Sequence, residues 1–329
     1  MRAERHSNPS RVAAAALLLA VGPLLVAGRA AAAEAYPTRP IEVVVPFGPG
    51  GGADVMGRQF AKQAEAKLGV AMPVTNLAGA SGDLGLARVA ASPADGYVVG
   101  QVIALTVTSW AAGVGTPRLD GLEYIALMQN SPSMLFVSKN SPLRSFADLV
   151  AEAKARPGSI DVATSGVGTP DEITLRYLAA NGIATVAIPF GKPGERYSST
   201  VAGHTDVLYE EPGDVVGFLQ SGDLRSLVVF DAKRHPAFPE VPTSGEFGLE
   251  ISDLPNFRAL AVPAGTPPER VEKLRAVAGE ILASPEWQAF CAGTYTCTDA
   301  LAPAGVKELV ASTYERAKGY LERFKTAAK

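Results

Sequence analysis

The stretch that decides the fold is residues 41–68, which read IEVVVPFGPGGGADVMGRQFAKQAEAKL. Its beginning, Ile41 to Val45, is a short β-branched run of the kind found in buried strands. An apolar residue then recurs at every fourth position from Met56 to Leu68, which predicts a helix that ends at Gly69. The stretch therefore predicts a strand, a glycine-rich loop and a helix.

The loop between that strand and helix, Pro46 to Asp54, holds four glycines and two prolines. Its backbone amides are exposed, and the following helix adds unpaired first-turn N–H groups and the positive end of its dipole, so the natural guest is an anion. A tight structural turn is the alternative. The predicted ligand-binding residues here are Phe47, Gly48, Pro49, Gly50, Gly51, Gly52, Ala53 and Asp54.

Two nucleotide-binding motifs were compared with this loop. The spacing Gly48-x-Gly50-x-x-Ala53 fits the dinucleotide fingerprint, but the next predicted strand ends at Asn76, where an acidic ribose partner would be expected. No Gly-Lys-Ser/Thr follows the glycines, as a Walker loop requires. An oxidoreductase that binds a nucleotide is therefore only a weak alternative.

The chain has 329 residues, of which 47% are hydrophobic and 19% charged, enough for two globular domains. Basic residues precede an apolar run from Val12 to Val26, and small residues follow it, which predicts a secretory signal over residues 1–35 with cleavage before Tyr36. A membrane anchor is the alternative, although the run is too short to span a bilayer. The sequence has no basic patch, and this argues against a nucleic-acid partner.

Strand-like and helical segments alternate along the rest of the chain, which predicts an α/β fold with a parallel sheet covered by helices. Apolar runs at Met134 to Val137 and Phe257 to Val262 look like paired crossings between two lobes. The predicted lobes are residues 36–133 plus 257–329 and residues 134–256, with a cleft that closes around a ligand.

The second predicted lobe offers two candidate binding segments. Thr164, Ser165, Gly166, Gly168 and Thr169 form a loop after a strand, where Thr169 and Glu172 fit a helix capping box. Another strand ends at Glu210 and Glu211, a position where open α/β sheets place their chemistry. The alternatives are that Asp171 and Glu172 only cap a helix, and that Glu210 and Glu211 are solvated loop acids.

The sequence contains few groups that could carry out a reaction. It has no G-x-S-x-G elbow and no H-E-x-x-H pair, and His204 and His235 look like surface residues, so we expect no catalytic residue, metal or cofactor. Cys291 and Cys297 flank a glycine-containing turn, and in an exported protein this pair predicts a disulfide.

Several motifs, in their order and spacing, resemble the periplasmic receptors of tripartite tricarboxylate transporters, also called Bug proteins. The resemblance covers nearly the whole chain after residue 35. The motifs are Tyr36-Pro37-x-Arg39-Pro40-Ile41, Pro46-Phe47-Gly48-Pro49-Gly50-Gly51 with Asp54, the Gly79 to Gly85 loop, Ser92-Pro93-x-Asp95-Gly96-Tyr97, Ile188-Pro189-Phe190 with Gly203 and Asp206-Val207, Val241-Pro242-Thr243, and Pro263-Ala264-Gly265-Thr266-Pro267.

The resemblance implies a two-lobed periplasmic binding protein that catalyses no reaction. Such a protein captures a small organic acid or amino acid and delivers it to a membrane permease. The resemblance also implies a periplasmic location and a monomer, and a sensory role with a signalling partner is the alternative. It places further ligand contacts at Gly82 and at Thr164 to Thr169, and Phe190 is another predicted ligand-binding residue.

The chain departs from the family pattern at four places. Gly52-Ala53 stands where the family usually has Ser or Thr, Asp171-Glu172 where it often has Ser-His, Phe190-Gly191 where it often has Tyr-Lys, and Glu210-Glu211 in a stretch that is usually less acidic. Two buried acids would disfavour a second free carboxylate. We therefore expect the solute to direct an amine or hydroxyls toward Glu210 or Glu211.

Overall fold

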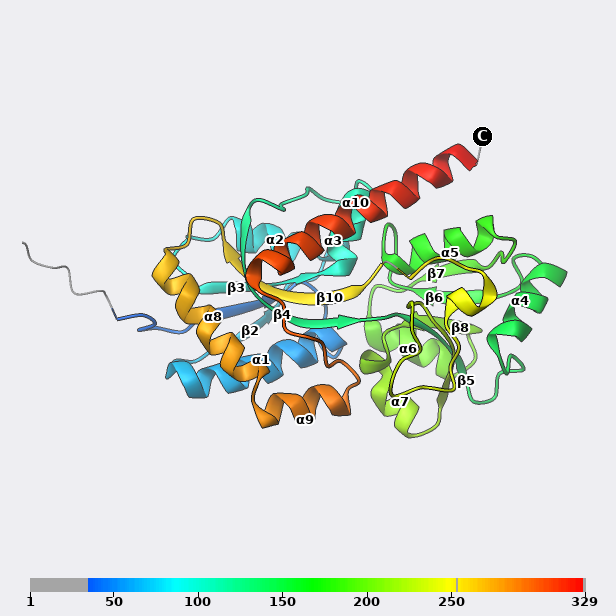
Figure 1. The fold of residues 1–329 in the computed structure, drawn as a ribbon, viewed down its shortest axis with the longest axis horizontal. Helices are drawn as coiled ribbons and strands as arrows, with labels where there is room; N and C mark the ends of the chain where they lie inside the picture. Colours follow the sequence, from blue (N-terminus) through cyan, green and yellow to red (C-terminus); the bar gives the residue numbers. More distant parts are fainter. Residues whose placement is uncertain (1–34, 253, 328–329) are drawn as a thin grey trace, which may run out of the picture. The chain divides into compact units, whose positions relative to one another are not determined.

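The computed structural model describes residues 35–252 and 254–327, and residues 36–329 form one compact unit. The predicted secretory signal lies outside the described residues, apart from Ala35. Two sheets with surrounding helices make up this unit (Figure 1). The α/β class predicted from the sequence is confirmed, and the two sheets form the cores of two lobes.

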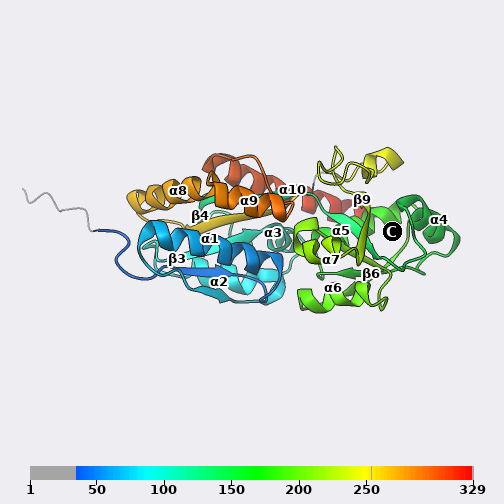
Figure 2. The same cartoon turned by 90° about the horizontal axis from the view of Figure 1, so that it is seen from below.

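The first sheet has the strand order β2-β1-β3-β10-β4. One face packs on α1 and α8 and the other on α2, α3 and the start of α10, and Figure 2 shows helices on both sides of this sheet. The elements are β1 (Glu42–Val45), α1 (Gly52–Leu68), β2 (Val74–Asn76), α2 (Asp83–Ala90), β3 (Val98–Ile103), α3 (Ala104–Ala111), β4 (Leu122–Ser131), β10 (Asn256–Pro263), α8 (Pro268–Leu282), α9 (Pro285–Gly293) and α10 (Pro303–Ala327).

The second sheet has the order β7-β6-β8-β5-β9. Ser145 caps the first helix of this lobe through a capping box with Asp148. The elements are β5 (Met134–Ser138), α4 (Phe146–Ala155), β6 (Asp161–Thr164), α5 (Pro170–Ala180), β7 (Val186–Pro189), α6 (Pro193–Val201), β8 (Val207–Glu210), the 3₁₀ turn η2 (Pro212–Val215), α7 (Val216–Gln220) and β9 (Leu224–Val229).

The sequence predicted a parallel sheet, and this holds only in part, because both sheets are mixed. β1 pairs parallel with β2 and β3, and β6 pairs parallel with β7 and β8. However, β10 runs antiparallel to β3 and β4, and β5 runs antiparallel to β8 and β9. The reversed strands are β5 and β10, which are the first strands after each crossing, because the chain enters each lobe there from the other lobe rather than through a helix of the same lobe.

The chain crosses between the sheets twice. It passes from β4 to β5 through Pro132 and Ser133, and it returns from β9 to β10. Asn256 donates a hydrogen bond from Nδ2 to Ser133 Oγ at 2.5 Å, which joins the two crossings side by side. The exact lobe boundaries, 36–133 plus 257–329 and 134–256, stay a prediction with which the strand membership agrees.

The last helix, α10, contacts both lobes (Figure 1). Val306 and Val310 are buried in the core on the first sheet, whereas Ala317 and Tyr320 are buried in the core of the second. Tyr320 also packs edge-on against Tyr177 of α5, with ring centroids 6.1 Å apart. The prediction that this helix packs on the first lobe therefore holds only for its N-terminal half.

The predicted disulfide between Cys291 and Cys297 is present, with the Cα atoms 4.7 Å apart. It closes a turn after α9 that lies against the second lobe. Tyr295 packs on Phe238 with ring centroids 4.9 Å apart, and His235, predicted to be a surface residue, is half-buried beside them. The bridge therefore stabilises a turn that contributes to the contact between the lobes.

Replacing both cysteines by serine should lower the free energy of unfolding by about 2 kcal/mol, because the bridge closes only a short loop of the unfolded chain. Urea unfolding with and without dithiothreitol measures this effect. The reductant should lower the midpoint of the wild-type protein and leave that of the double variant unchanged. A wild-type midpoint that does not respond to full reduction would contradict the prediction.

Candidate functional site

The glycine loop between β1 and α1 is organised by Asp54, in the first turn of the helix. Its carboxylate accepts hydrogen bonds from the Gly50 amide at 3.0 Å and from Asn76 Nδ2 at 2.9 Å, and it pairs with Arg58 at 2.9 Å. Asn76 also donates to the Phe47 carbonyl at 2.9 Å. Asp54 and Asn76 therefore fix the course of the loop from Phe47 to the start of the helix.

Opposing effects act on the pKa of the Asp54 carboxyl. Burial raises it, but hydrogen bonds from Arg58, the Gly50 amide and Asn76 outweigh burial and bring the pKa below its usual value. The carboxylate is therefore charged at neutral pH and holds the loop in place. Its contribution to stability is present above the pKa of the unfolded chain and is lost as the pH falls through the lowered value.

The second loop, between β6 and α5, bonds to carboxylates of its own chain. Asp171 accepts a hydrogen bond from the Ser165 amide and contacts the Thr169 hydroxyl, and Glu172 accepts a hydrogen bond from the Gly168 amide at 2.5 Å. Thr169 is the N-cap of α5 and Pro170 its first residue, as predicted. The predicted capping box is wrong, since Thr169 Oγ1 donates to the Gly166 carbonyl at 2.7 Å instead of capping the helix.

Helix α3, which was not predicted from the sequence, connects the loops of the two lobes. A Cβ on Gly82 would overlap the Thr106 hydroxyl and lie 3.1 Å from the Phe47 ring, so the Gly79–Gly85 loop is packed against the first loop. At the other end of the helix, Ser109 Oγ donates to the Val167 carbonyl at 3.2 Å. The Thr164–Thr169 loop is thus held against the first lobe through α3.

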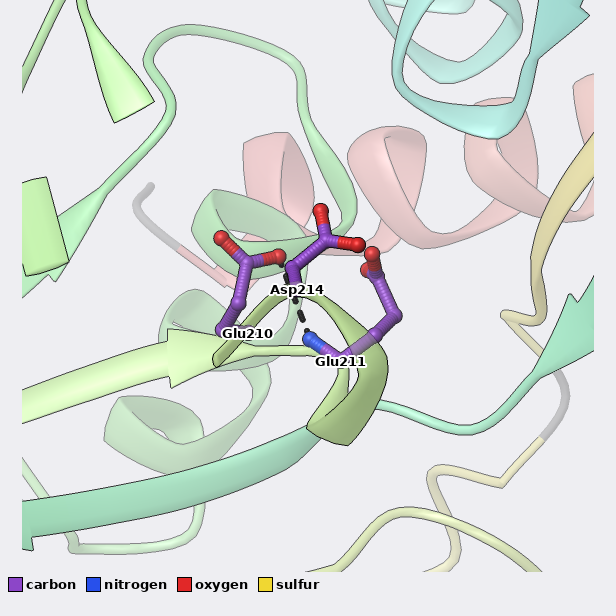
Figure 3. A group of neighbouring side chains, drawn as sticks. All are labelled: Glu210, Glu211 and Asp214. Atoms are coloured by element: carbon purple, nitrogen blue, oxygen red, sulfur yellow. Dashed lines mark hydrogen bonds between the residues drawn. The ribbon is translucent and has the colours of Figure 1, made fainter. Parts of the chain in front are cut away.

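Three carboxylates gather where β8 ends, and Figure 3 shows Glu210, Glu211 and Asp214 on the same side of this turn. Glu210 pairs with Arg196 of α6, and its other oxygen accepts a hydrogen bond from the Glu211 amide at 3.1 Å. Arg258 of β10 contacts Glu211 at 3.1 Å and Asp214 at 2.7 Å. Arginines from both lobes therefore face this acidic turn.

Burial dominates the electrostatics of the acidic turn. It raises the pKa of Glu211 well above the usual value, and the neighbouring Glu210 and Asp214 raise it further. Burial also raises the pKa of Glu210, although the Arg196 guanidinium opposes this. The alternative that Glu210 and Glu211 are solvated loop acids is wrong, since they are only 5% and 3% exposed.

The acidic turn reaches the first lobe directly at Gly52. A Cβ on Gly52 would overlap the Asp214 carboxylate, so that carboxylate lies against the first residue of α1. Nearby, a Cβ on Gly51 would lie 3.0 Å from Pro193 Cγ, where α6 begins. A cavity of about 120 Å³ remains beside these contacts, lined in part by Gly50, Gly52, Gly213, Asp214 and Arg258.

The oxygens of Glu210, Glu211 and Asp214 lie within 4.8 Å of one another, a spacing at which carboxylates can bind a metal ion. In this chain the same carboxylates are bonded to Arg196 and Arg258. The two guanidinium groups therefore supply part of the positive charge that a metal would otherwise bring.

The structure brings many of the predicted site residues into contact with one another or with shared elements. The Phe47–Asp54 loop contacts Gly82, the start of α6 and the acidic turn. The Thr164–Thr169 loop contacts α3. Phe190 continues from β7 and its amide donates to the Thr164 carbonyl at 2.9 Å. That these residues bind a ligand stays a prediction.

Sequence reasoning missed Asp214, the third carboxylate of the turn, as well as the cations Arg196 and Arg258 that pair with the turn and Gln129, which contacts Arg258. Arg258 carried a signal, because it is a charged residue inside the otherwise apolar run Phe257–Val262. All eight residues of β10 are buried, so an arginine there needs a buried partner. Arg196 carried no comparable signal, since it stands in a polar helix.

Comparisons with known proteins agree with this architecture. A sequence model described as the tripartite tricarboxylate transporter family receptor matches residues 56–320. BugT of Bordetella pertussis is 32% identical over 262 residues, which are 77% of this chain and 79% of BugT.

Two solved structures share the fold. MatC from Rhodopseudomonas palustris, solved with bound malate, has a TM-score of 0.77 at 25% identity and covers 87% of this chain and 99% of its own. An R. palustris protein solved with adipate has a TM-score of 0.82 at 23% identity, covering 88% and 99% of the two chains. The chain belongs to the tripartite tricarboxylate transporter receptor family.

Proposed function

We propose that this protein is an extracytoplasmic receptor that captures a small carboxylate-bearing solute by closure of its two lobes and delivers it to a membrane permease. The observation that carries the proposal is the glycine loop at the start of α1, fixed by Asp54 and facing the second lobe at Gly51 and Gly52. A loop of this kind presents amides and a helix dipole to an anion.

Family membership supports the same reading. MatC and the adipate-bound protein share the fold of this chain, and their solved structures hold malate and adipate, which are dicarboxylates. A receptor role places this protein in the periplasm, with a permease as partner and without catalysis of its own. In the part of the chain that the structure describes, no helix is sufficiently long and apolar to cross a membrane.

A thermal-shift screen of the exported chain against organic acids and amino acids tests the proposal, because a ligand that binds only the folded state raises the melting temperature. At least one carboxylate should raise it in a concentration-dependent way, and calorimetry should give a 1:1 complex. A broad panel of carboxylates that leaves the melting temperature unchanged would contradict the proposal.

Replacing Asp54 by alanine should weaken binding of the best carboxylate from that screen about tenfold or more, because the loop loses the hydrogen bonds to a charged group that fix it. Isothermal calorimetry measures the change. Asp148→Ala is the matched control, since Asp148 also accepts backbone amides at the start of a helix but lies exposed on α4. Equal affinities of the Asp54→Ala and Asp148→Ala variants for the ligand would show that Asp54 does not support ligand binding.

A further inference from the structure

The charged side chains around the acidic turn do not balance. Asp171, Glu210, Glu211 and Asp214 face two arginines, Arg196 and Arg258, and all six side chains are almost fully buried. Arg196 interacts electrostatically with Asp171, Glu210 and Glu211. Arg258 interacts in the same way with Glu210, Glu211 and Asp214. If every group were ionised, the cluster would carry two negative charges in excess.

Both guanidinium groups are already engaged. Arg196 donates to Ser165 Oγ and to Glu210. Arg258 donates to Gln129 Oε1 at 2.9 Å from one nitrogen, and its other terminal nitrogen contacts both Asp214, at 2.7 Å, and Glu211, at 3.1 Å. Glu211 therefore shares with Asp214 a single nitrogen and has no cation to itself.

Buried donors without a partner lie beside the same cluster. Within residues 35–252 and 254–327, Gln129 Nε2, Arg196 Nε and the Tyr197 hydroxyl are buried and lack a hydrogen-bond partner. Gln129 is the residue that holds Arg258, and the Tyr197 ring lies 5.3 Å from the Arg196 guanidinium carbon. Buried donors of this kind are normally satisfied, so they indicate an acceptor from outside the chain.

A positive group would compensate the excess of carboxylates, and a hydrogen-bond acceptor would satisfy the unpartnered donors. A zwitterionic solute provides both groups, because it carries an ammonium and a carboxylate. Resting on the function proposed above, we propose that the solute is an amino acid whose ammonium group is read by Glu211 and Asp214, and that these residues select it over dicarboxylates. The cavity of about 120 Å³ beside Asp214 has the volume of about four waters. It holds one end of such a solute, so the lobes part to admit the rest.

Three pairs of probes with equal numbers of methylene groups test the selectivity: β-alanine and succinate, 4-aminobutyrate and glutarate, 5-aminopentanoate and adipate. Calorimetry on the exported chain should find at least one amino acid bound at least about tenfold more tightly than its dicarboxylate, since like charges brought together in a desolvated site are strongly disfavoured. Dicarboxylates that bind as tightly or more tightly in every pair would overturn the inference, as would failure of all six probes.

The two proposals fail in different ways. If the dicarboxylates bind as tightly as the amino acids or more tightly, the proposed selectivity is wrong, but the proposed receptor function stands. If the six probes and a wider panel of hydroxy, keto and aromatic acids all fail to bind, the receptor function fails as well.

Glu211→Gln tests the residue assignment, because it keeps the shape of the side chain and removes the charge. The ratio of amino-acid to dicarboxylate affinity should fall at least about tenfold. Glu286→Gln removes the same charge from an exposed side chain of α9, 55% exposed, and should leave the ratio unchanged. Asp214→Asn provides a second test of the same affinity ratio. A ratio that stays unchanged in both Glu211→Gln and Asp214→Asn would overturn the assignment.

Discussion

Replacing Arg258 by methionine is expected to destabilise the protein by about 3–5 kcal/mol at neutral pH, the cost of leaving buried charges uncompensated. Methionine retains much of the buried side chain but removes the cation that contacts Glu211 and Asp214. Urea unfolding monitored by circular dichroism measures the change. The exposed pair of Arg234 with Glu246 supplies the control, since Arg234→Met should have a much smaller effect.

The loss in Arg258→Met should shrink as the pH is lowered. Burial, Glu210 and Asp214 already raise the pKa of Glu211 in the wild-type protein, and removal of Arg258 would raise it further. A group with a raised pKa contributes stability below its unfolded pKa and loses it as the pH rises through the folded value. Adding Glu211→Gln and Asp214→Asn to the variant should restore part of the stability. A loss that is independent of pH and not rescued would contradict this account.

Replacing Gly52 by alanine should have the second largest effect, a loss of about 3 kcal/mol, which combines overpacking with displacement of the Asp214 carboxylate from Arg258. The new methyl group would overlap that carboxylate. Gly48→Ala is the matched control for unfolding, because it makes the same change in the same loop with no atom within 4 Å of the added Cβ.

A double variant separates overlap from any general effect of alanine at the start of the helix. In the presence of Asp214→Ala, the additional cost of Gly52→Ala should largely disappear, because the three atoms nearest to the added Cβ all belong to the Asp214 carboxyl group. If the two substitutions destabilise additively, the contact between Gly52 and Asp214 is not what the glycine accommodates.

This contact bears on how the chain departs from its family pattern. The family resemblance implies only that Gly52 stands where Ser or Thr is usual and that Glu210-Glu211 lies in a stretch that is usually less acidic. The structure joins the two departures, because a side chain at position 52 would exclude Asp214. In this chain, the absence of a side chain at position 52 therefore makes room for the Asp214 carboxylate.

The sequence by itself determined the local elements and the candidate loops. The strand, loop and helix from Ile41 to Leu68, the Ser145 cap and the Cys291–Cys297 bridge all depend on residues close together in the chain, where periodicity, capping and spacing are legible. Sheet direction was misread, because the pattern of a buried strand is the same whichever way its neighbour runs.

Only the tertiary structure decided how the charges pair and where the lobes touch. Arg258 is 47 residues from Glu211 and 44 from Asp214, and it lies on a strand of the other sheet. No local pattern specifies such a pair, since it exists only after two crossings have brought β10 beside the end of β8. The physical reason is that burial makes each of these charges costly until the fold supplies its partner.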